Sequence, residues 1–221
     1  MPCSVKILKM DWLTANVLCL TLEKPPFYSF DIGQAVEVTL DLPRFYGDVA
    51  PFTLTGLISD DYLELIIKVY PAHKGITLAI SNLREGDKLI ISDPWDSYSN
   101  LGPGIFIAGG TGITSFVSFL RQLKGAQNLA ETRLFFVNKT EQEIFLSEEL
   151  RQIQGKNYVN VLTRENKENF LSGHVDLDFL RNHIPDIHRS FYICGPGGFS
   201  EQIKYQLVTM GADPAQVNIG Y

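Results

Sequence analysis

The sequence is poor in cysteine, and this limits the metal and redox chemistry that it can support. Its three cysteines, Cys3, Cys19 and Cys194, lie far apart among 221 residues. They form no CxxC pair of a zinc site, and they cannot build a disulfide framework. They also cannot supply the four thiolates of an ordinary 2Fe–2S cluster. We therefore expect no metal site and a reducing, cytoplasmic environment.

Positive charge and long apolar runs are also scarce. The chain has 19 Lys and Arg against 25 Asp and Glu, for a net charge of −6. It shows no basic stripe, which argues against nucleic acid as a partner. The N-terminus has no apolar signal-peptide core, and no uninterrupted apolar run is long enough to span a bilayer. We expect neither a targeting signal nor a membrane span.

In the first half of the chain, apolar and polar residues alternate with a period of two, which is typical of half-buried strands. Turn residues such as KPPF, SDD and REGD separate these segments. The intervals favour an antiparallel barrel or sandwich, with a short helix over 76–83. The predicted strands are SVKIL, NVLCLTLE, AVEVTLDL, YLELIIKVY and DKLIIS.

After the glycine-rich segment SNLGPG (99–104), short apolar strands alternate with helical segments. This order predicts a parallel sheet with helices on its faces. We therefore expect two domains, a β-barrel over 1–100 and an α/β domain over 101–221. The expected strands include IFIAGG, TRLFFVN, NYVNVLT, SFYICG and QVNIGY, and the first expected helix ends at Gly125.

Two glycine-rich loops follow predicted strands of the second half. GGTG (109–112) follows IFIA, and CGPGG (194–198) follows SFYI. Ligands of such sheets bind beyond the carboxyl ends of the strands, and backbone N–H groups at a helix start favour phosphate. The alternative is that these loops are only tight turns and that Cys194 is a core residue.

With these loops the chain resembles the flavin-dependent ferredoxin/flavodoxin–NAD(P) reductases, over nearly its whole length. GGTGIT is similar to the family's pyridine-nucleotide phosphate loop, and CGPGGF to the loop beside the nicotinamide. NKTEQEIFLSEEL (138–150) resembles the segment near the adenosine. One departure is Ser115, which stands where the family has a proline. The resemblance implies that the nucleotide is bound by Gly109, Gly110, Thr111, Gly112, Thr114, Lys139, Cys194, Gly195 and Pro196.

The first half resembles the family's flavin-binding barrel, whose motif is Arg-x-(Tyr/Phe)-(Ser/Thr). APFT (50–53) matches this motif except at its first position, where Ala50 stands in place of the arginine. Arg44, nearby in the sequence, could supply the missing positive charge. The segment IKVYPAHKGIT (67–77) resembles the loop around the flavin phosphate, where His73 could add charge. The resemblance implies FAD rather than FMN, bound by Pro51, Phe52, Thr53, Lys74, Gly75, Ile76 and Thr77. The resemblance also implies two catalytic residues: Thr53, beside the flavin N5, and Cys194, beside the nicotinamide.

Three further features bear on the resemblance. Asp96 stands where the family commonly has a glycine. Tyr221 either stacks on the flavin, as a terminal aromatic does in some members, or is a frayed end. Glu141 and Glu143 beside Lys139 would repel the 2′-phosphate of NADPH, so we favour NADH, although Arg164 could restore NADPH binding.

By the resemblance, the protein is an NAD(P)H-dependent flavoprotein reductase. Electrons would pass through FAD to a soluble one-electron acceptor, namely a flavodoxin, a ferredoxin or an oxygenase component. Two alternatives stay open: a reductase of free flavin, which tolerates the missing arginine, and a non-catalytic nucleotide-binding sensor or subunit.

Overall fold

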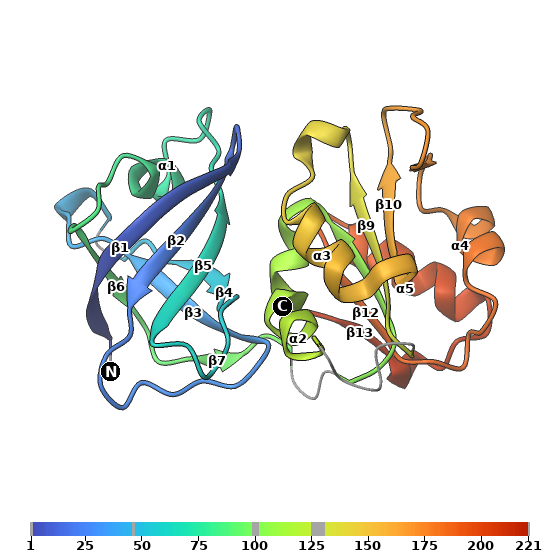
Figure 1. Ribbon diagram of the computed structural model, residues 1–221, viewed down its shortest axis with the longest axis horizontal. Coiled ribbons are helices and arrows are strands. Elements are labelled where there is room, and N and C mark those ends of the chain that lie inside the picture. Colours follow the sequence, from blue (N-terminus) through green and yellow to red (C-terminus); the bar gives the residue numbers. More distant parts are fainter. Residues whose placement is uncertain (1, 46, 99–101, 125–130, 221) are drawn as a thin grey trace. The chain divides into compact units, whose positions relative to one another are not determined.

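A computed structural model describes residues 2–45, 47–98, 102–124 and 131–220 (Figure 1). The chain divides into two compact units, 1–99 with 117–119 and 100–116 with 120–221. We call them the N-terminal and the C-terminal unit. Among the described helices, none is both long and apolar enough to cross a membrane.

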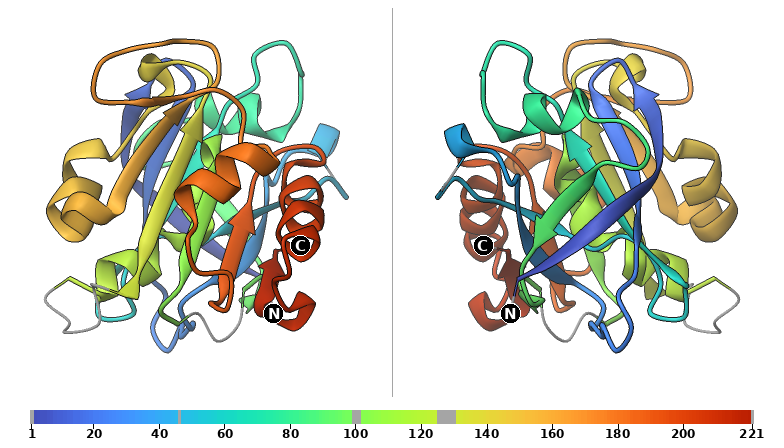
Figure 2. Two further views of the ribbon diagram at one scale, coloured as in Figure 1. Left: turned by 90° about the vertical axis from the view of Figure 1, so that its right-hand side faces the viewer. Right: turned by 90° about the vertical axis from the view of Figure 1, so that its left-hand side faces the viewer.

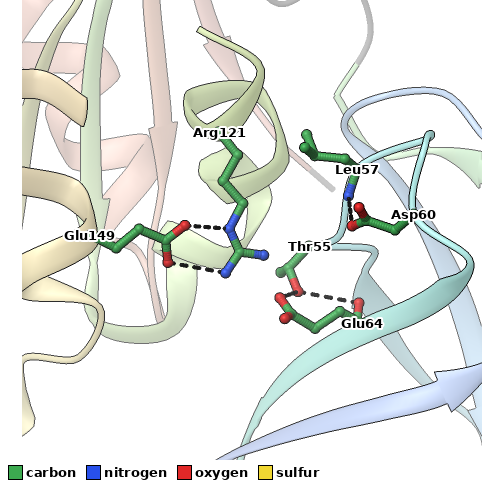
Figure 3. Close-up of polar contacts among 6 residues, drawn as sticks. All are labelled: Thr55, Leu57, Asp60, Glu64, Arg121 and Glu149. Carbon is green, nitrogen blue, oxygen red and sulfur yellow. Dashed lines mark hydrogen bonds and ion pairs between the residues drawn. The ribbon is translucent and has the colours of Figure 1, made fainter. Parts of the chain in front are cut away.

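The N-terminal unit is built on one antiparallel sheet. Its strands follow the order β4-β3-β6-β1-β2-β5, and β7 pairs with β3. After β4 the chain meets β5: Leu54 bridges Leu65, and the Thr55 N–H donates to the Glu64 carbonyl at 2.9 Å. The Thr55 hydroxyl also donates to the Glu64 carboxylate at 2.7 Å (Figure 3). These bonds join the two ends of the strand order, which confirms the predicted barrel. The elements are β1 (Cys3–Thr14), β2 (Val17–Glu23), β3 (Gln34–Thr39), η1 (Pro43–Phe45), β4 (Ala50–Thr53), β5 (Tyr62–Lys68), α1 (Ile76–Ser81), β6 (Lys88–Ile91) and β7 (Trp95–Asp96).

Strand β1 is longer than the sequence pattern indicates, because it serves two pairings. Its first residues, Cys3–Lys6, pair with β6, and the rest pairs with β2. The register with β2 shifts between Ile7 and Lys9 and again between Trp12 and Thr14. Such irregularities bend a strand, so β1 can turn a corner of the barrel. The side chains that alternate inward from these strands form the core, which includes Val5, Leu20, Val36, Leu65 and Leu89.

The C-terminal unit contains a parallel sheet in the order β11-β10-β9-β8-β12-β13. This confirms the predicted parallel α/β arrangement, including the last strand. The two-residue strand β11, at the sheet edge, has no counterpart in the sequence pattern. The elements are β8 (Ile105–Gly109), η2 (Gly110–Ile113), α2 (Thr114–Gln122), β9 (Arg133–Asn138), η4 (Glu141–Glu143), α3 (Ser147–Gln154), η5 (Gly155–Asn157), β10 (Tyr158–Leu162), β11 (Leu171–Ser172), α4 (Leu177–His183), β12 (Phe191–Cys194), α5 (Phe199–Thr209), η6 (Pro214–Gln216) and β13 (Val217–Ile219). Helix α2 ends at Gln122, and its predicted end at Gly125 lies outside the described residues.

Helices cover both faces of this sheet (Figures 1 and 2). On one face, Phe179 of α4 and Ile203 of α5 pack against Ile107, Phe135 and Ile193. The alternate strand residues point to the other face, where the Phe106 and Phe116 rings meet edge to face at 5.0 Å. On that face the Arg121 guanidinium joins α2 to α3. It donates two hydrogen bonds to the Glu149 carboxylate, at 2.7 and 3.1 Å (Figure 3).

Candidate functional site

In the C-terminal unit the two glycine-rich loops lie side by side. Strands β8 and β12 are paired in parallel, with Ala108 opposite Cys194, so both loops leave the same edge of the sheet. This is the edge at which open α/β sheets bind ligands. The structure therefore brings together two motifs that are about eighty residues apart in the sequence.

The glycines of the first loop have different surroundings. A Cβ atom on Gly112 would overlap the carbonyl oxygen of Cys194 and lie 2.9 Å from the Gly195 nitrogen. Gly112 therefore permits a direct backbone contact between the loops. Gly110 has φ +54°, which few side chains adopt, and nothing lies within 4 Å of its Cβ position. Space for a ligand at this turn is thus found at Gly110, whereas Gly112 packs against protein.

Phe199 at the start of α5 links the two loops through its ring. A Cβ on Gly109 would lie 3.2 Å from this ring, and a Cβ on Gly195 would overlap it. Sequence reasoning missed this role. The residue stands in the CGPGGF motif, but its contact with Gly109 depends on the pairing of β8 and β12.

Two side-chain hydrogen bonds order the start of α2. The Thr114 hydroxyl donates to the Thr111 carbonyl at 2.9 Å, within the turn. The Ser115 hydroxyl donates to the Cys194 sulfur at 3.4 Å, across to the second loop. Ser115 is buried at 6% exposure, whereas Cys194 is partly exposed. The cysteine thus stands at the mouth of the loops rather than in the core. Pro196, which follows Gly195 in the same loop, is exposed.

The loops after β9 and β10 carry a cluster of opposite charges. The Lys167 ammonium lies 2.6 Å from the Glu141 carboxylate and 3.7 Å from that of Glu165. The hydrogen bond from Lys167 to Glu141 raises the pKa of Lys167. Lys139 and Arg164 are exposed, and the Arg164 N–H donates to the Lys139 carbonyl at 3.0 Å. Glu165 and Lys167 were not among the predicted residues, because their partner Glu141 belongs to a different strand's loop.

In the N-terminal unit, the APFT segment forms the whole of β4. Pro51 is exposed, in keeping with a strand that lies at one end of the sheet order. Phe52 packs against the core while remaining partly exposed. Thr53 is buried, at 8% exposure. Phe52 thus offers a partly exposed aromatic ring, which suits contact with a flat heteroaromatic ring.

The predicted phosphate loop leads into α1, which begins at Ile76. Lys74 and Gly75 are exposed, and Thr77 is partly exposed. Gly75 is the N-cap of α1, no side chain caps the helix, and nothing lies within 4 Å of the Gly75 Cβ position. The ring of His73 lies against that of Tyr70, with centroids 5.7 Å apart. This segment therefore offers a cation, a hydroxyl and open backbone, which are the groups that a phosphate requires.

Two departures from the family pattern can be placed, at Asp96 and Ala50, whereas the Arg44 side chain and Tyr221 cannot. Asp96 in β7 accepts a hydrogen bond from the Gln34 amide at 2.9 Å, so this carboxylate fastens β7 to β3. Ala50 opens β4 with no charge, and the side chain of Arg44 lies outside what the structure describes. Tyr221 lies outside the described residues as well.

Comparison with known protein families finds two domain models that match successive parts of the chain. Residues 3–96 match the model of an FAD-binding domain, and residues 106–204 match that of an oxidoreductase NAD-binding domain. Together the two matches account for most of the sequence. The chain therefore contains the binding domains of both cofactors.

Individual relatives agree with the domain matches. The reductase component of propane 2-monooxygenase from Rhodococcus jostii is 24% identical over 86% of this chain and 55% of its own length. NADH-cytochrome b5 reductase 2 from Meyerozyma guilliermondii is 29% identical over 71% of this chain and 58% of its own length. The chain thus spans little more than half of these relatives.

A solved structure shows the same fold over the full length. The ferredoxin NADP+ reductase from Neisseria gonorrhoeae, with bound FAD and NADP, superposes with a TM-score of 0.82 at 18% identity. The match covers 99% of this chain and 97% of that one. From the two domain matches, we conclude that the chain belongs to the oxidoreductases that combine an FAD-binding domain with an NAD-binding domain.

Proposed function

We propose that the protein is an NAD(P)H-dependent flavoprotein reductase that passes electrons to a separate one-electron acceptor. The observation that carries this proposal is the contact between the two glycine-rich loops at one edge of the parallel sheet. It supports a nucleotide site in a chain whose N-terminal unit matches an FAD-binding domain. When bound, the flavin would supply the redox chemistry, taking two electrons from the nucleotide and giving them up singly.

Each proposed binding residue has a task that its surroundings permit. Phe52 and Thr53 would hold the flavin ring by apolar contact and by hydrogen bonding. Lys74, Gly75, Ile76 and Thr77 would bind the flavin phosphates. In the other unit, the backbone of Gly109 to Gly112 with Thr111 and Thr114 would receive the nucleotide phosphates. Cys194, Gly195 and Pro196 would orient the nicotinamide, and Lys139 would contact the adenosine side.

The acceptor is proposed by class. Relatives include the reductase component of an oxygenase and NADH-cytochrome b5 reductases, and these names point to protein acceptors. Residues 1–221 contain three cysteines, too few for an ordinary 2Fe–2S centre of their own. We propose a flavodoxin, a ferredoxin or an oxygenase component as the acceptor. A cytoplasmic location remains a prediction based on the three cysteines, which carry free thiols.

The experiment begins with the absorbance spectrum of the purified protein and the mass of any flavin released on denaturation. Anaerobic titration with NADH and NADPH should then bleach the bound flavin, and ferricyanide should be reduced at steady state. A protein that binds both cofactors but oxidises neither nucleotide with ferricyanide would contradict the proposal and favour a non-catalytic sensor or subunit.

One observation favours a second function. Ala50 removes the cation that the family places at this position, and a reductase of free flavin needs only a shallow site for the ring. Under this alternative, the purified protein would be colourless, and added flavin would behave as a substrate with a KM instead of a retained cofactor. The departure at Asp96 does not favour it, because the carboxylate there has a structural partner in Gln34.

A further inference from the structure

Cys194 has a hydrogen-bond donor beside it that the family pattern does not provide. Where related loops have proline, this chain has Ser115, and its hydroxyl donates to the Cys194 sulfur at 3.4 Å. Proline carries no donor and acts only through its fixed φ. The replacement therefore exchanges a rigid ring for a polar contact with the residue proposed to lie at the nicotinamide.

Neighbouring backbone and side-chain contacts fix the positions of Ser115 and Cys194 relative to each other. Gly112 lets the backbones of the two loops touch, which fixes the start of α2 against Cys194. The bond from Thr114 to the Thr111 carbonyl closes the intervening turn. Ser115 is buried at 6% exposure, so its hydroxyl reaches the partly exposed sulfur from the protein interior. A cysteine has three staggered χ1 rotamers, and a fixed donor selects among them.

We propose that Ser115 is a positioning residue of the nucleotide site: its hydroxyl holds the Cys194 side chain in the orientation that aligns the bound nicotinamide ring for flavin reduction. The inference rests on the proposed function and adds to it a residue outside the family's motif. Ser115 itself is buried behind the cysteine, so it acts through Cys194 and not on the nucleotide.

Helix α2 provides a matched control. Ser118 lies about one turn beyond Ser115, is fully buried, and its hydroxyl has no hydrogen-bond partner among the described residues. Ser115→Ala and Ser118→Ala thus each remove one buried hydroxyl from the same helix, but only the first removes a contact with Cys194. Ser115→Thr keeps the hydroxyl and serves as the rescue variant.

The first measurement does not depend on enzyme activity. Alkylation of each cysteine by iodoacetamide is followed by peptide mass spectrometry, with Cys3 and Cys19 as internal references. A donor beside the sulfur stabilises its reactive anion, so Ser115→Ala should slow labelling of Cys194 about threefold or more. Ser115→Thr should restore the rate, and Ser118→Ala should leave it unchanged. Unchanged labelling in Ser115→Ala would overturn the inference.

The second measurement is the rate of flavin bleaching at saturating NADH. We expect Ser115→Ala to slow it about threefold to tenfold with an unchanged nucleotide Kd, and to have no further effect when combined with Cys194→Ala. An equal effect in the presence and absence of Cys194 would overturn the positioning role. If neither NADH nor NADPH bleaches the flavin of the wild-type protein, the proposed function is contradicted as well, whereas normal bleaching with unchanged labelling of Cys194 would contradict this inference alone.

Discussion

The Glu165 carboxylate accepts a hydrogen bond from the backbone N–H of Glu141 at 2.9 Å, which ties the loop after β10 to the loop after β9. Lys167 completes the arrangement by pairing with both carboxylates. One cation near the predicted adenosine segment is therefore already neutralised, and two carboxylates stand beside it.

This arrangement predicts a preference for NADH, to be measured as a higher kcat/KM than for NADPH. Replacing both carboxylates, in Glu141→Gln/Glu165→Gln, frees Lys167 and should raise kcat/KM for NADPH about fivefold, the effect of roughly 1 kcal/mol at an exposed site. Glu168→Gln, an exposed change in the same loop, is the control. A strong preference of the wild type for NADPH would show that Lys139 and Arg164 are sufficient to bind the 2′-phosphate.

Restoring the family's arginine should strengthen flavin binding. A charge-assisted hydrogen bond is worth about 1.5–3 kcal/mol, so Ala50→Arg should lower the flavin Kd about tenfold or more. Binding is measured by fluorescence titration of the apoprotein. Val49→Arg, at a neighbouring residue with 51% exposure, controls for added charge alone. Unchanged affinity in Ala50→Arg would mean that another group already fills the role.

Gly75→Ala separates flavin binding from folding. The backbone has φ −92°, and the added Cβ meets nothing within 4 Å, so the free energy of unfolding should be unchanged or rise by about 0.4–1 kcal/mol. If a phosphate approaches this backbone, the methyl group should weaken flavin binding at least about threefold, or roughly 0.7 kcal/mol. Urea unfolding of the apoprotein and flavin titration give the two values. Full flavin affinity in this variant would place the phosphate elsewhere.

Gly112→Ala should act on the fold itself. Its Cβ would meet the backbone of Cys194 and Gly195, which cannot yield as a flexible side chain does, so we expect a loss of about 1–3 kcal/mol in the free energy of unfolding. Gly110→Ala has open space and bears only the strain of a positive φ, about 1–2 kcal/mol. Because the losses in the free energy of unfolding expected for the two variants overlap, nucleotide binding distinguishes Gly110→Ala from Gly112→Ala more clearly than stability does. Gly110→Ala should weaken nucleotide binding in protein that remains folded.

Cys194→Ala tests whether the cysteine acts in the reaction or only packs. We expect the flavin spectrum and most of the stability to be kept, and flavin reduction at saturating nucleotide to slow at least about tenfold for lost positioning. Stopped-flow bleaching under anaerobic conditions measures it. A rate near that of the wild type, together with a lower Tm, would leave Cys194 as a packing residue.

The sequence by itself determined the two architectures. Alternation of apolar residues in segments such as YLELIIK marked strands of an antiparallel sheet, and the alternation of strands and helices after residue 104 marked a parallel one. These patterns are local, because burial of one face imposes a period that is visible in a single segment. The glycine-rich loops could be placed at one edge of the sheet for another reason: the strands before them are parallel, so they end on the same side of the sheet.

Only the tertiary structure decided which partners the individual side chains have. The contact of Ser115 with Cys194 and that of Glu141 with Glu165 each join segments whose proximity follows from strand order and register. The division of β1 between β6 and β2 depends on register shifts that no alternation reveals. The two-residue strand β7 is too short to have a period, and it is held by its pairing with β3 and by the bond from Gln34 to Asp96. Periodicity reports which face of a segment is buried, whereas register is set by the fit of many distant residues at once.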